Sequence, residues 1–366
     1  MEWNQRKRTQ TGNEIENKRI IKKNLYKFRA CFITKRIMKK ALFLLLFFQL
    51  FFSACQKKKN ADAEKTSGKI NTISVIIDDP LWNGEVGDSI RNKFASPVIG
   101  LPQEEPLFTI NQYPVRLLEG FMTNTRNIIV VKKEAKNHFE FIENEYASPQ
   151  NVFHISGKTA ASILEQLEVH APEIIEKMRA TEIAENQKTI DTSKIDTKKI
   201  RRKFNIDIDV PKGYNYVLQR RKFIWLKKEI TSGNTSILIY QLPMDRVRKN
   251  ADVTNKIISI RDSIGNLYIH GTNPNTQMVT EDSYAPYLFH INIKGKETFE
   301  TKGTWELKND FMSGPFINYC IIDRTNKRIL VLEGFCYDPS KEKRDLMFEL
   351  EAIIKSVEFL KPKTKK

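Results

Sequence analysis

Residues 316–336, FINYCIIDRTNKRILVLEGFC, set the fold class of the C-terminal part of this chain. Two apolar runs, Phe316–Asp323 and Arg328–Cys336, flank the polar stretch Arg324–Lys327, which favours a turn. The pattern predicts an antiparallel hairpin in which Cys320 lies opposite Val331. Cys336 then lies further along the second strand and on the other face of the sheet. Because a disulfide needs Cα atoms within about 7 Å, we expect both thiols to be free.

The segments around this hairpin predict an antiparallel sheet with helices. Phe204–Val210 alternates apolar and polar residues, which is typical of a strand. The other predicted strands are Lys222–Glu229 and Thr235–Leu242, which form a hairpin, then Leu288–Lys294, Thr298–Leu307 and Val357–Leu360. One helix is expected after a cap at Asp252 or Thr254, and a second begins at Asp338-Pro339-Ser340. Residues 201–361 therefore predict a C-terminal α+β domain, an antiparallel meander sheet covered by two helices.

Residues 71–200 predict a second α+β domain, an N-terminal α/β sandwich of the pattern β-α-β-β-α. Its expected strands are Thr72–Ile77, Asn127–Lys133 and Asn151–Ile155, and its expected helices are Leu81–Ala95, one capped by Ser156, and one with Pro172 in its first turn. Four prolines in residues 96–114 favour an extended connection. Within it, Leu101–Phe108 (LPQEEPLF), called the strap below, is expected to pack across the sheet or line a groove.

The stretch MKKALFLLLFFQLFFSAC, Met38–Cys55, predicts where the mature protein lies. Two lysines, an apolar run and the small pair Ser53-Ala54 follow the order of a secretory signal peptide, residues 38–54 counted from Met38. The apolar run is short for a membrane span, which needs about 20 residues. The cysteine after the small pair is typical of a bacterial lipobox, in which Cys55 would carry the lipid. Phe52 in place of leucine and Lys57-Lys58-Lys59 depart from the usual pattern.

Charge favours neither nucleic acid nor a membrane surface as the partner of the folded part. The formal net charge is +17, but residues 1–54 alone carry 13 basic and 3 acidic residues. Residues 1–37 predict a disordered basic extension or a misassigned start, and residues 55–70 a flexible tether. The alternative is a cytosolic protein that uses this basic arm on nucleic acid.

Few residues suggest chemistry, and no catalytic residue, metal site or cofactor is predicted. Asp78 and Asp79 end a strand before a helix, where carboxylates act as acid and base, hold a ligand, or only stabilise the helix. Gly157-Lys158-Thr159 lacks the earlier glycine of a phosphate-binding loop, because Val152 stands there. Asp207 and Asp209 share one side of their strand and are more typical of a solvated face than of a calcium site.

Two further patterns favour surface chemistry of ordinary kinds. The basic runs Arg201–Lys203 and Arg220–Lys222 would face anionic lipid or glycan, or form a solvated edge. The five histidines are scattered, and none has metal-ligand spacing; they are His138, His154, His170, His270 and His290.

The chain resembles a family of uncharacterised envelope lipoproteins of Bacteroidota. The resemblance rests on FFSAC, IIDDPLWNGEVGDSIR, LPQEEPLF, RNIIVV and LVLEGFCYDPSKEKRDLMFELEAIIKSVEF, and it covers about Met38 to Leu360. It implies a lipid on Cys55, an envelope location and no known activity. We expect a periplasmic binding or assembly module, anchored by lipid to a membrane of the envelope, on the periplasmic side of the outer membrane. Its partner is an envelope protein or a ligand. The alternatives are an envelope enzyme using Asp78 or Asp79 beside the strap, and the cytosolic nucleic-acid-binding protein.

Overall fold

The computed structural model describes residues 64–118, 123–247 and 252–361, all within one structural unit that starts at Ala63. The extension 1–37, the signal 38–54 and Cys55 lie outside the described residues. Glu64–Lys65 (β1) already pairs in parallel with Ala147–Ser148 (β6), so the end of the expected tether joins the folded part. Among the described residues, no helix is both long enough and apolar enough to cross a bilayer.

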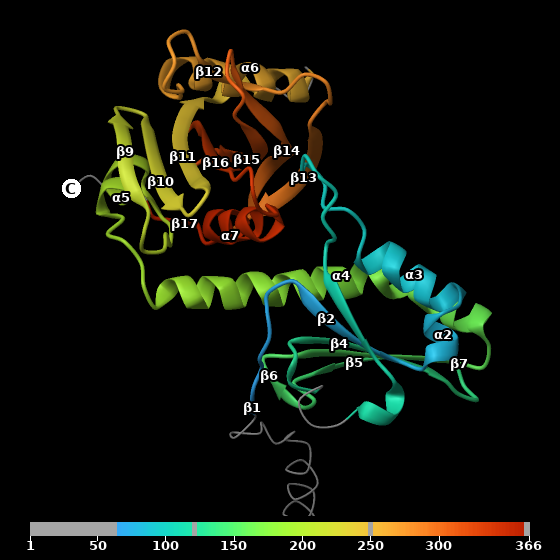
Figure 1. The fold of residues 1–366 in the computed structure, drawn as a ribbon. Coiled ribbons are helices and arrows are strands. Elements are labelled where there is room, and N and C mark those ends of the chain that lie inside the picture. Colours follow the sequence, from blue (N-terminus) through green and yellow to red (C-terminus); the bar gives the residue numbers. More distant parts are fainter. Residues whose placement is uncertain (1–63, 119–122, 248–251, 362–366) are drawn as a thin grey trace, which may run out of the picture. The chain divides into compact units, whose positions relative to one another are not determined.

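The fold is α+β, and its N-terminal sheet has five strands in the order β3-β2-β4-β7-β5 (Figure 1). The strands are β2 (Thr72–Ile77), β3 (Thr109–Tyr113), β4 (Asn127–Lys133), β5 (His138–Glu143) and β7 (Asn151–Gly157). The first four strands in this order run parallel, and β5 is antiparallel to β7. Two short helices follow β2, which are α2 (Asp79–Trp82) and α3 (Glu85–Phe94). β3 was not predicted, because its sequence lies within the proline-rich connection.

One long helix, α4 (Ala160–Asp191), packs with α3 on one face of this sheet. The predicted break before Pro172 is wrong, because the helix runs through this proline. A proline inside a helix costs about 3 kcal/mol, but Ala171, Ile174 and Met178 beside it are buried in the core. The predicted cap at Ser156 is also wrong: Thr159 Oγ1 accepts from Ser162 N at 3.1 Å, and Thr159 N donates to Ser162 Oγ.

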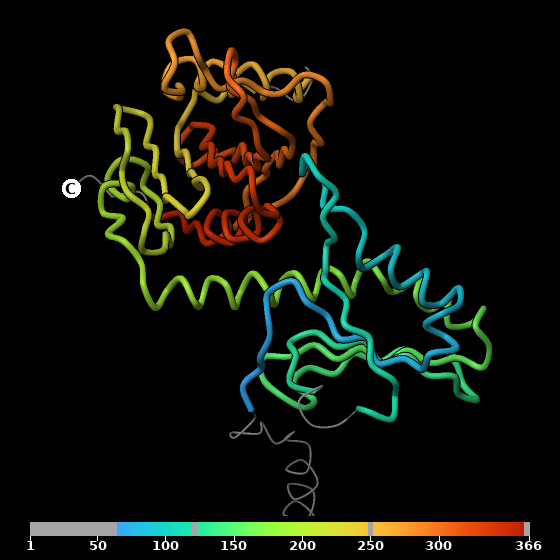
Figure 2. Tube along the Cα trace, in the orientation of Figure 1, coloured from blue at the N-terminus to red at the C-terminus, as the bar shows by residue number. Residues whose placement is uncertain are grey.

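The C-terminal sheet is antiparallel in the order β12-β14-β15-β16-β11-β10-β9, with β13 beside β14. Its strands are β9 (Asn215–Arg220), β10 (Phe223–Ile230), β11 (Gly233–Pro243), β12 (Gln277–Thr280), β13 (Tyr287–Ile293), β14 (Lys296–Lys308), β15 (Ser313–Asp323) and β16 (Arg328–Tyr337). A simple meander is wrong, because the chain leaves at β11, crosses through α6 (Val253–Tyr268) and returns to pair β16 with β11. The tube in Figure 2 follows this path.

The central hairpin has the predicted register. Cys320 on β15 lies opposite Val331 on β16. Cys320 and Cys336 enter different core clusters on the two faces of the sheet, and both are buried free thiols. The two faces are covered by the two predicted helices: α6 lies with one cluster and α7 (Arg344–Lys355) with the other. Both strands are therefore buried on both sides, which explains why they are mainly hydrophobic.

Most of Phe204–Val210 is not a strand, as the sequence predicted it to be, but the side chains predicted to face the core do so. Phe204 ends a helix, α5 (Lys198–Phe204), and only Ile206–Asp207 (β8) pairs, with the closing strand β17 (Glu358–Phe359). Phe204, Ile206, Ile208 and Val210 are nevertheless all buried. Asn205 adopts φ 51° and breaks the extended path between them.

The strap is one arm of a loop that doubles back, so the predicted extended path through residues 96–108 is wrong. We call residues 96–107 the strap loop. Val98 N donates to Glu105 O at 2.9 Å, and Leu107 N donates to Ser96 O at 2.8 Å. Gly100 turns the tip at φ 87°, and a Cβ there would lie 2.9 Å from Lys302 Cβ on β14. The loop therefore reaches from α3 to the C-terminal sheet (Figure 1).

Helix α7 begins at Arg344, six residues after the predicted start at Asp338. Its first amides are capped from the strap loop: Glu105 Oε1 accepts from Lys343 N at 2.8 Å, and Oε2 accepts from Arg344 N at 2.7 Å. Asp338 instead accepts from Ser232 Oγ and Ser340 N. The carboxylate that fixes the helix start thus comes from the other half of the chain, where no local pattern would reveal it.

Candidate functional site

The two predicted carboxylates, Asp78 and Asp79, lie exposed at the C-terminal end of β2. Asp78 Oδ1 accepts from Val115 N at 3.1 Å, and Asp79 Oδ1 accepts from Gln112 Nε2 at 3.3 Å. Their expected place beside the strap is wrong. The cavity beside the strap includes Asn71, which precedes β2. Seven extended residues at about 3.3 Å each place Asp78 roughly 23 Å from Asn71.

The other sequence patterns have ordinary partners. Gly157 ends β7 at the strand–helix turn before α4. Asp207 pairs with Arg201, and Asp209 with Lys194 at 2.9 Å. Among the described residues, no group of three His, Cys, Asp or Glu side chains has the arrangement of a metal site. The two basic runs do meet, because Lys203 Nζ donates to Arg220 O.

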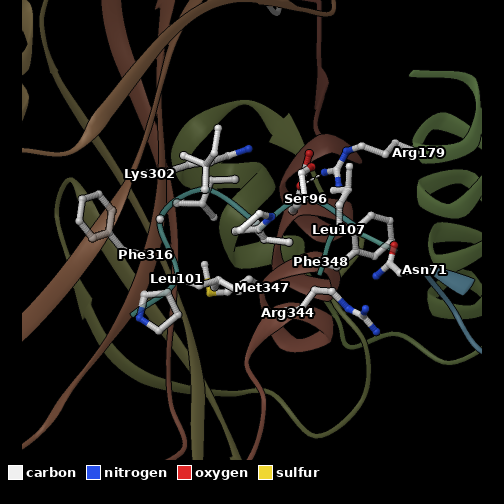
Figure 3. A pocket seen from close by; sticks show the side chains of 17 residues that line it. Asn71, Ser96, Leu101, Leu107, Arg179, Lys302, Phe316, Arg344, Met347 and Phe348 are labelled. Carbon is white, nitrogen blue, oxygen red and sulfur yellow. Dashed lines mark hydrogen bonds and ion pairs between the residues drawn. The ribbon is translucent and has the colours of Figure 1, made fainter. Parts of the chain in front are cut away.

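A cavity of about 210 Å³ lies between the strap loop, α4, α7 and the C-terminal sheet (Figure 3). Its walls are mainly apolar and include Leu101, Leu107, Phe316, Ile317, Met347 and Phe348. Figure 3 places Leu101 and Phe316 at one side of the view and Asn71 beside Phe348 at the other. An apolar cavity with a few polar groups is the usual form of a small-molecule site. We take this cavity as the candidate functional site.

The charged side chains that line the cavity are all ion-paired. Arg179 on α4 lies 2.6 Å from Glu351 on α7, and Lys355 approaches the other oxygen of Glu351 at 2.6 Å. Lys302 lies 3.5 Å from Glu300. Arg344 contacts Asp345 at 2.9 Å. Because Arg179 and Lys355 share the carboxylate of Glu351, these pairs do not cancel, and the described lining residues carry three cations and one carboxylate.

Glu351 is ionised in spite of its burial. Burial alone would raise the pKa of this carboxyl, but the charges of Arg179, Lys355 and Lys302 lower the pKa well below its ordinary value of 4.5. A group with a lowered pKa stabilises the fold above the pKa of the unfolded chain, and this contribution is lost as the pH falls.

We expect Glu351→Gln to lower the free energy of unfolding at pH 7 by about 1.5–3 kcal/mol, the value of hydrogen bonds to a charged group. The difference from the wild type should shrink as the pH falls below about 4.5, where the unfolded carboxyl takes up a proton. Urea unfolding at several pH values measures both. Glu358→Gln, which removes a carboxylate from a 59% exposed side chain, is the control and should change little. A pH-independent loss for Glu351→Gln would contradict the charge argument.

Asn71, one of the lining residues, has a buried side-chain oxygen, Oδ1, without a hydrogen-bond partner among the described residues. Asn71 is 1% exposed. Its Nδ2 donates to Asp345 Oδ1 at 3.1 Å. The amide cannot be flipped, because its oxygen would then face a carboxylate, which only accepts. The side-chain oxygen of Asn71 is thus a buried acceptor without a partner, which is costly for the fold.

The sequence did not point to these residues. Asn71 precedes β2, Arg179 lies on α4, and Arg344 and Glu351 lie on α7, so these three segments meet only because the strap loop and α4 both reach α7. The strap was expected to pack across the sheet or line a groove, and its Leu101 and Leu107 do line the cavity. The hydrogen bonds from the start of α7 to Glu105 were not expected.

Comparison with known families divides the chain into two matched segments. Residues 66–191 match a family model described as a domain of unknown function (DUF8532). Residues 192–356 match a second model with the same description (DUF4837). These matches support the coarser expectation, a protein with domains of unknown function, and leave the Bacteroidota lipoprotein resemblance as a prediction. No curated protein matches the chain.

Three solved structures align weakly with part of the chain. They are a mutant of the protein Mog1 (10% identity, 43% of this chain and 92% of that chain, TM-score 0.29), the PsbP protein CyanoP from Synechocystis sp. PCC 6803 (10%, 45% and 89%, 0.29) and the Ran-binding protein Mog1p from Saccharomyces cerevisiae (11%, 43% and 90%, 0.27). Similarity at this level supports no conclusion about function.

Proposed function

We propose that this chain is a lipid-anchored protein of the bacterial cell envelope and that its folded part binds a small ligand in the cavity beside the strap. The order of basic, apolar and small residues before Cys55 is the observation that supports export to the cell envelope. The proposed lipid site is Cys55, and the proposed compartment is the periplasmic side of the outer membrane. The Bacteroidota lipoprotein resemblance supports the same location.

The cavity supports a binding role more than a catalytic one. Its one buried carboxylate, Glu351, is paired with two cations, so it is a poor general base. Asp78 and Asp79, the carboxylates of the enzymatic alternative, lie at the far end of β2 from the cavity. We therefore propose a binding module whose partner is a ligand held against α7.

Replacing Cys55 tests the anchor. We expect the wild-type chain, expressed in bacteria with an alkyne-tagged fatty acid, to take up the tag and sediment with membranes. Cys55→Ser should lose the tag completely and keep its uncleaved N-terminus, because serine offers no thiol for a thioether bond. Cys31→Ser is the matched control and should behave as the wild type. Mass spectrometry of the N-terminus is the second measurement.

A tag retained in Cys55→Ser would refute the proposed lipid site. Peptides that begin at Met1, found in the soluble extract, would instead support the cytosolic alternative.

A further inference from the structure

We propose that the cavity beside the strap binds an amphiphilic monoanion, a carboxylate with an apolar tail, whose charged end lies at Arg179 and Lys302. The inference rests on the proposed binding role and names its ligand class. Three observations carry it, all within the part of the chain that the structure describes. They are an excess of positive charge at one side of the cavity, unused hydrogen-bond donors on the two cations, and an apolar wall beside them.

Positive charge is in excess around Glu351. Its carboxylate lies 2.6 Å from Arg179 and 2.6 Å from Lys355, and, as described above, the charge of Lys302 also acts on it. The second carboxylate at this side of the cavity, Glu300, lies 3.5 Å from Lys302. Three cations therefore face two carboxylates, and charge that is left uncompensated in a partly buried place is costly. One further negative charge, supplied by a ligand, would balance them.

Arg179 and Lys302 also have hydrogen-bond donors that are not in use. Arg179 donates through Nη2 to Glu351, and its Nη1 and Nε have no partner among the described residues. Lys302 Nζ contacts Glu300 as an ion pair and donates no hydrogen bond within the same ranges. Their side chains are 24% and 22% exposed, against 9% for Arg344, so a ligand can reach these two cations. A carboxylate suits them, because its oxygens only accept.

The rest of the lining suits an apolar tail. Below the two cations in Figure 3 lie four apolar side chains of the lining, Leu101, Leu107, Met347 and Phe348. Burial of an alkyl chain against such side chains is favourable, and the opening of the cavity to solvent leaves the length of the chain free. A peptide carboxyl terminus has the same charge, but its amide groups would need hydrogen-bond partners that these four side chains cannot supply. The lining therefore favours an alkyl carboxylate.

Hexanoate, hexanamide and acetate test the inference. Hexanoate and hexanamide have the same shape and differ in charge, whereas acetate keeps the carboxylate and lacks the tail. The full chain, as bacteria process it, is placed in phosphatidylcholine nanodiscs and labelled with ¹³C at the methionine methyl groups. Met347 lines the cavity and reports binding, whereas Met278, buried in the opposite core cluster, is the internal control. Empty nanodiscs give the amount of each probe that the lipid takes up.

We expect hexanoate to shift the Met347 resonance and, at low salt, to bind about tenfold more tightly than hexanamide, a difference of about 1.4 kcal/mol. Acetate should cause no shift at the same concentrations, because it has no tail to bury. Added salt should weaken the binding of hexanoate and leave that of hexanamide unchanged, because screening acts only on charges. The salt series uses the wild-type chain, so it decides the question even where a variant fails to fold.

Substitutions at Lys302 test the charged end of the site. Lys302→Gln should bring the ratio of the hexanoate and hexanamide affinities close to one, because it removes the excess positive charge. Lys302→Arg keeps the charge and should keep the ratio. Lys308→Gln is the matched control, because Lys308 is exposed on the same strand, β14, and lies outside the cavity lining. It should leave the ratio unchanged.

Three results would overturn the ligand class and leave the binding role standing: equal affinity for hexanoate and hexanamide, an affinity for hexanoate that salt does not change, or an unchanged ratio in Lys302→Gln. Tighter binding of N-acetyl-dileucine than of hexanoate would also overturn it, in favour of a peptide carboxyl terminus. No Met347 shift with any of these probes would overturn the binding role itself. The fatty-acid tag on Cys55 is measured independently, so the proposed anchor and the proposed ligand fail separately.

Discussion

Replacing Glu333 with alanine is expected to lower the free energy of unfolding by about 3–5 kcal/mol, the loss typical of breaking a buried ion pair. Glu333 on β16 accepts from Arg261 Nε at 3.0 Å and Nη2 at 2.8 Å, and from Asn318 Nδ2 at 2.6 Å. The side chains of Glu333 and Arg261 are each 1% exposed. Without Glu333, the guanidinium, which lies 3.4 Å from the centre of the Phe316 ring, would remain charged in the core.

Urea unfolding followed by circular dichroism measures this loss. Combining Glu333→Leu with Arg261→Met should recover most of it, because both charges are then replaced by apolar side chains. Glu229→Ala removes a carboxylate from an exposed pair with Lys227 and should change the free energy by no more than about 0.5 kcal/mol. Equal losses in Glu333→Ala and Glu229→Ala would show that the buried pair contributes nothing.

Replacing Glu105 with alanine should be the second large effect, a loss of about 2–6 kcal/mol. The change leaves the backbone N–H groups of Lys343 and Arg344 without their acceptor, at about 1–3 kcal/mol for each buried donor. It also removes a negative charge from the N-terminus of α7, where such a charge is favourable. Glu105 is 4% exposed, so water does not readily replace it.

The neighbouring Glu104 provides a matched control, because it is exposed on the same loop. Glu104→Ala should leave thermal unfolding almost unchanged, whereas Glu105→Ala should lower the melting temperature. Hydrogen exchange gives a local measurement: amides of the first turn of α7 should exchange faster in Glu105→Ala than in Glu104→Ala. Unchanged exchange there would mean that the carboxylate does not hold the helix start.

Periodicity predicted the central hairpin well because its two strands are neighbours in the sequence. The turn at Arg324–Lys327 fixes which residues face one another, and the alternation of faces then follows from strand geometry. The closing strand, the hairpin of β10 and β11 and the cap at Asp252 were predicted from similarly short patterns. In each case the deciding signal is local.

The errors arose where a distant contact overrides the local preference. Pro172 would end an isolated helix, but the sheet under α4 holds the helix together. The start of α7 depends on a carboxylate more than two hundred residues earlier in the chain. The crossover to β12 could not be told from a meander, because strand patterns do not state which neighbours pair.

The candidate site was harder to predict for a related reason. Asp78 and Asp79 attracted attention because adjacent carboxylates at a strand end are visible in a sequence. No sequence pattern distinguishes Asn71. Its place in the site depends on Asp345, which fixes the orientation of its amide, and on the apolar side chains around it. Only the strap, recognisable by its prolines, indicated the right part of the molecule.

The hydrogen bonds between Glu105 and the start of α7 also connect the two segments that match different family models. The two family-matched segments meet at residues 191 and 192, yet the acceptor for the helix start in the second lies in the first. Arg179, from the first segment, likewise neutralises Glu351 in the second. Residues 192–356 without the preceding segment would therefore lack the acceptor at the start of α7 and one of the two cations beside Glu351.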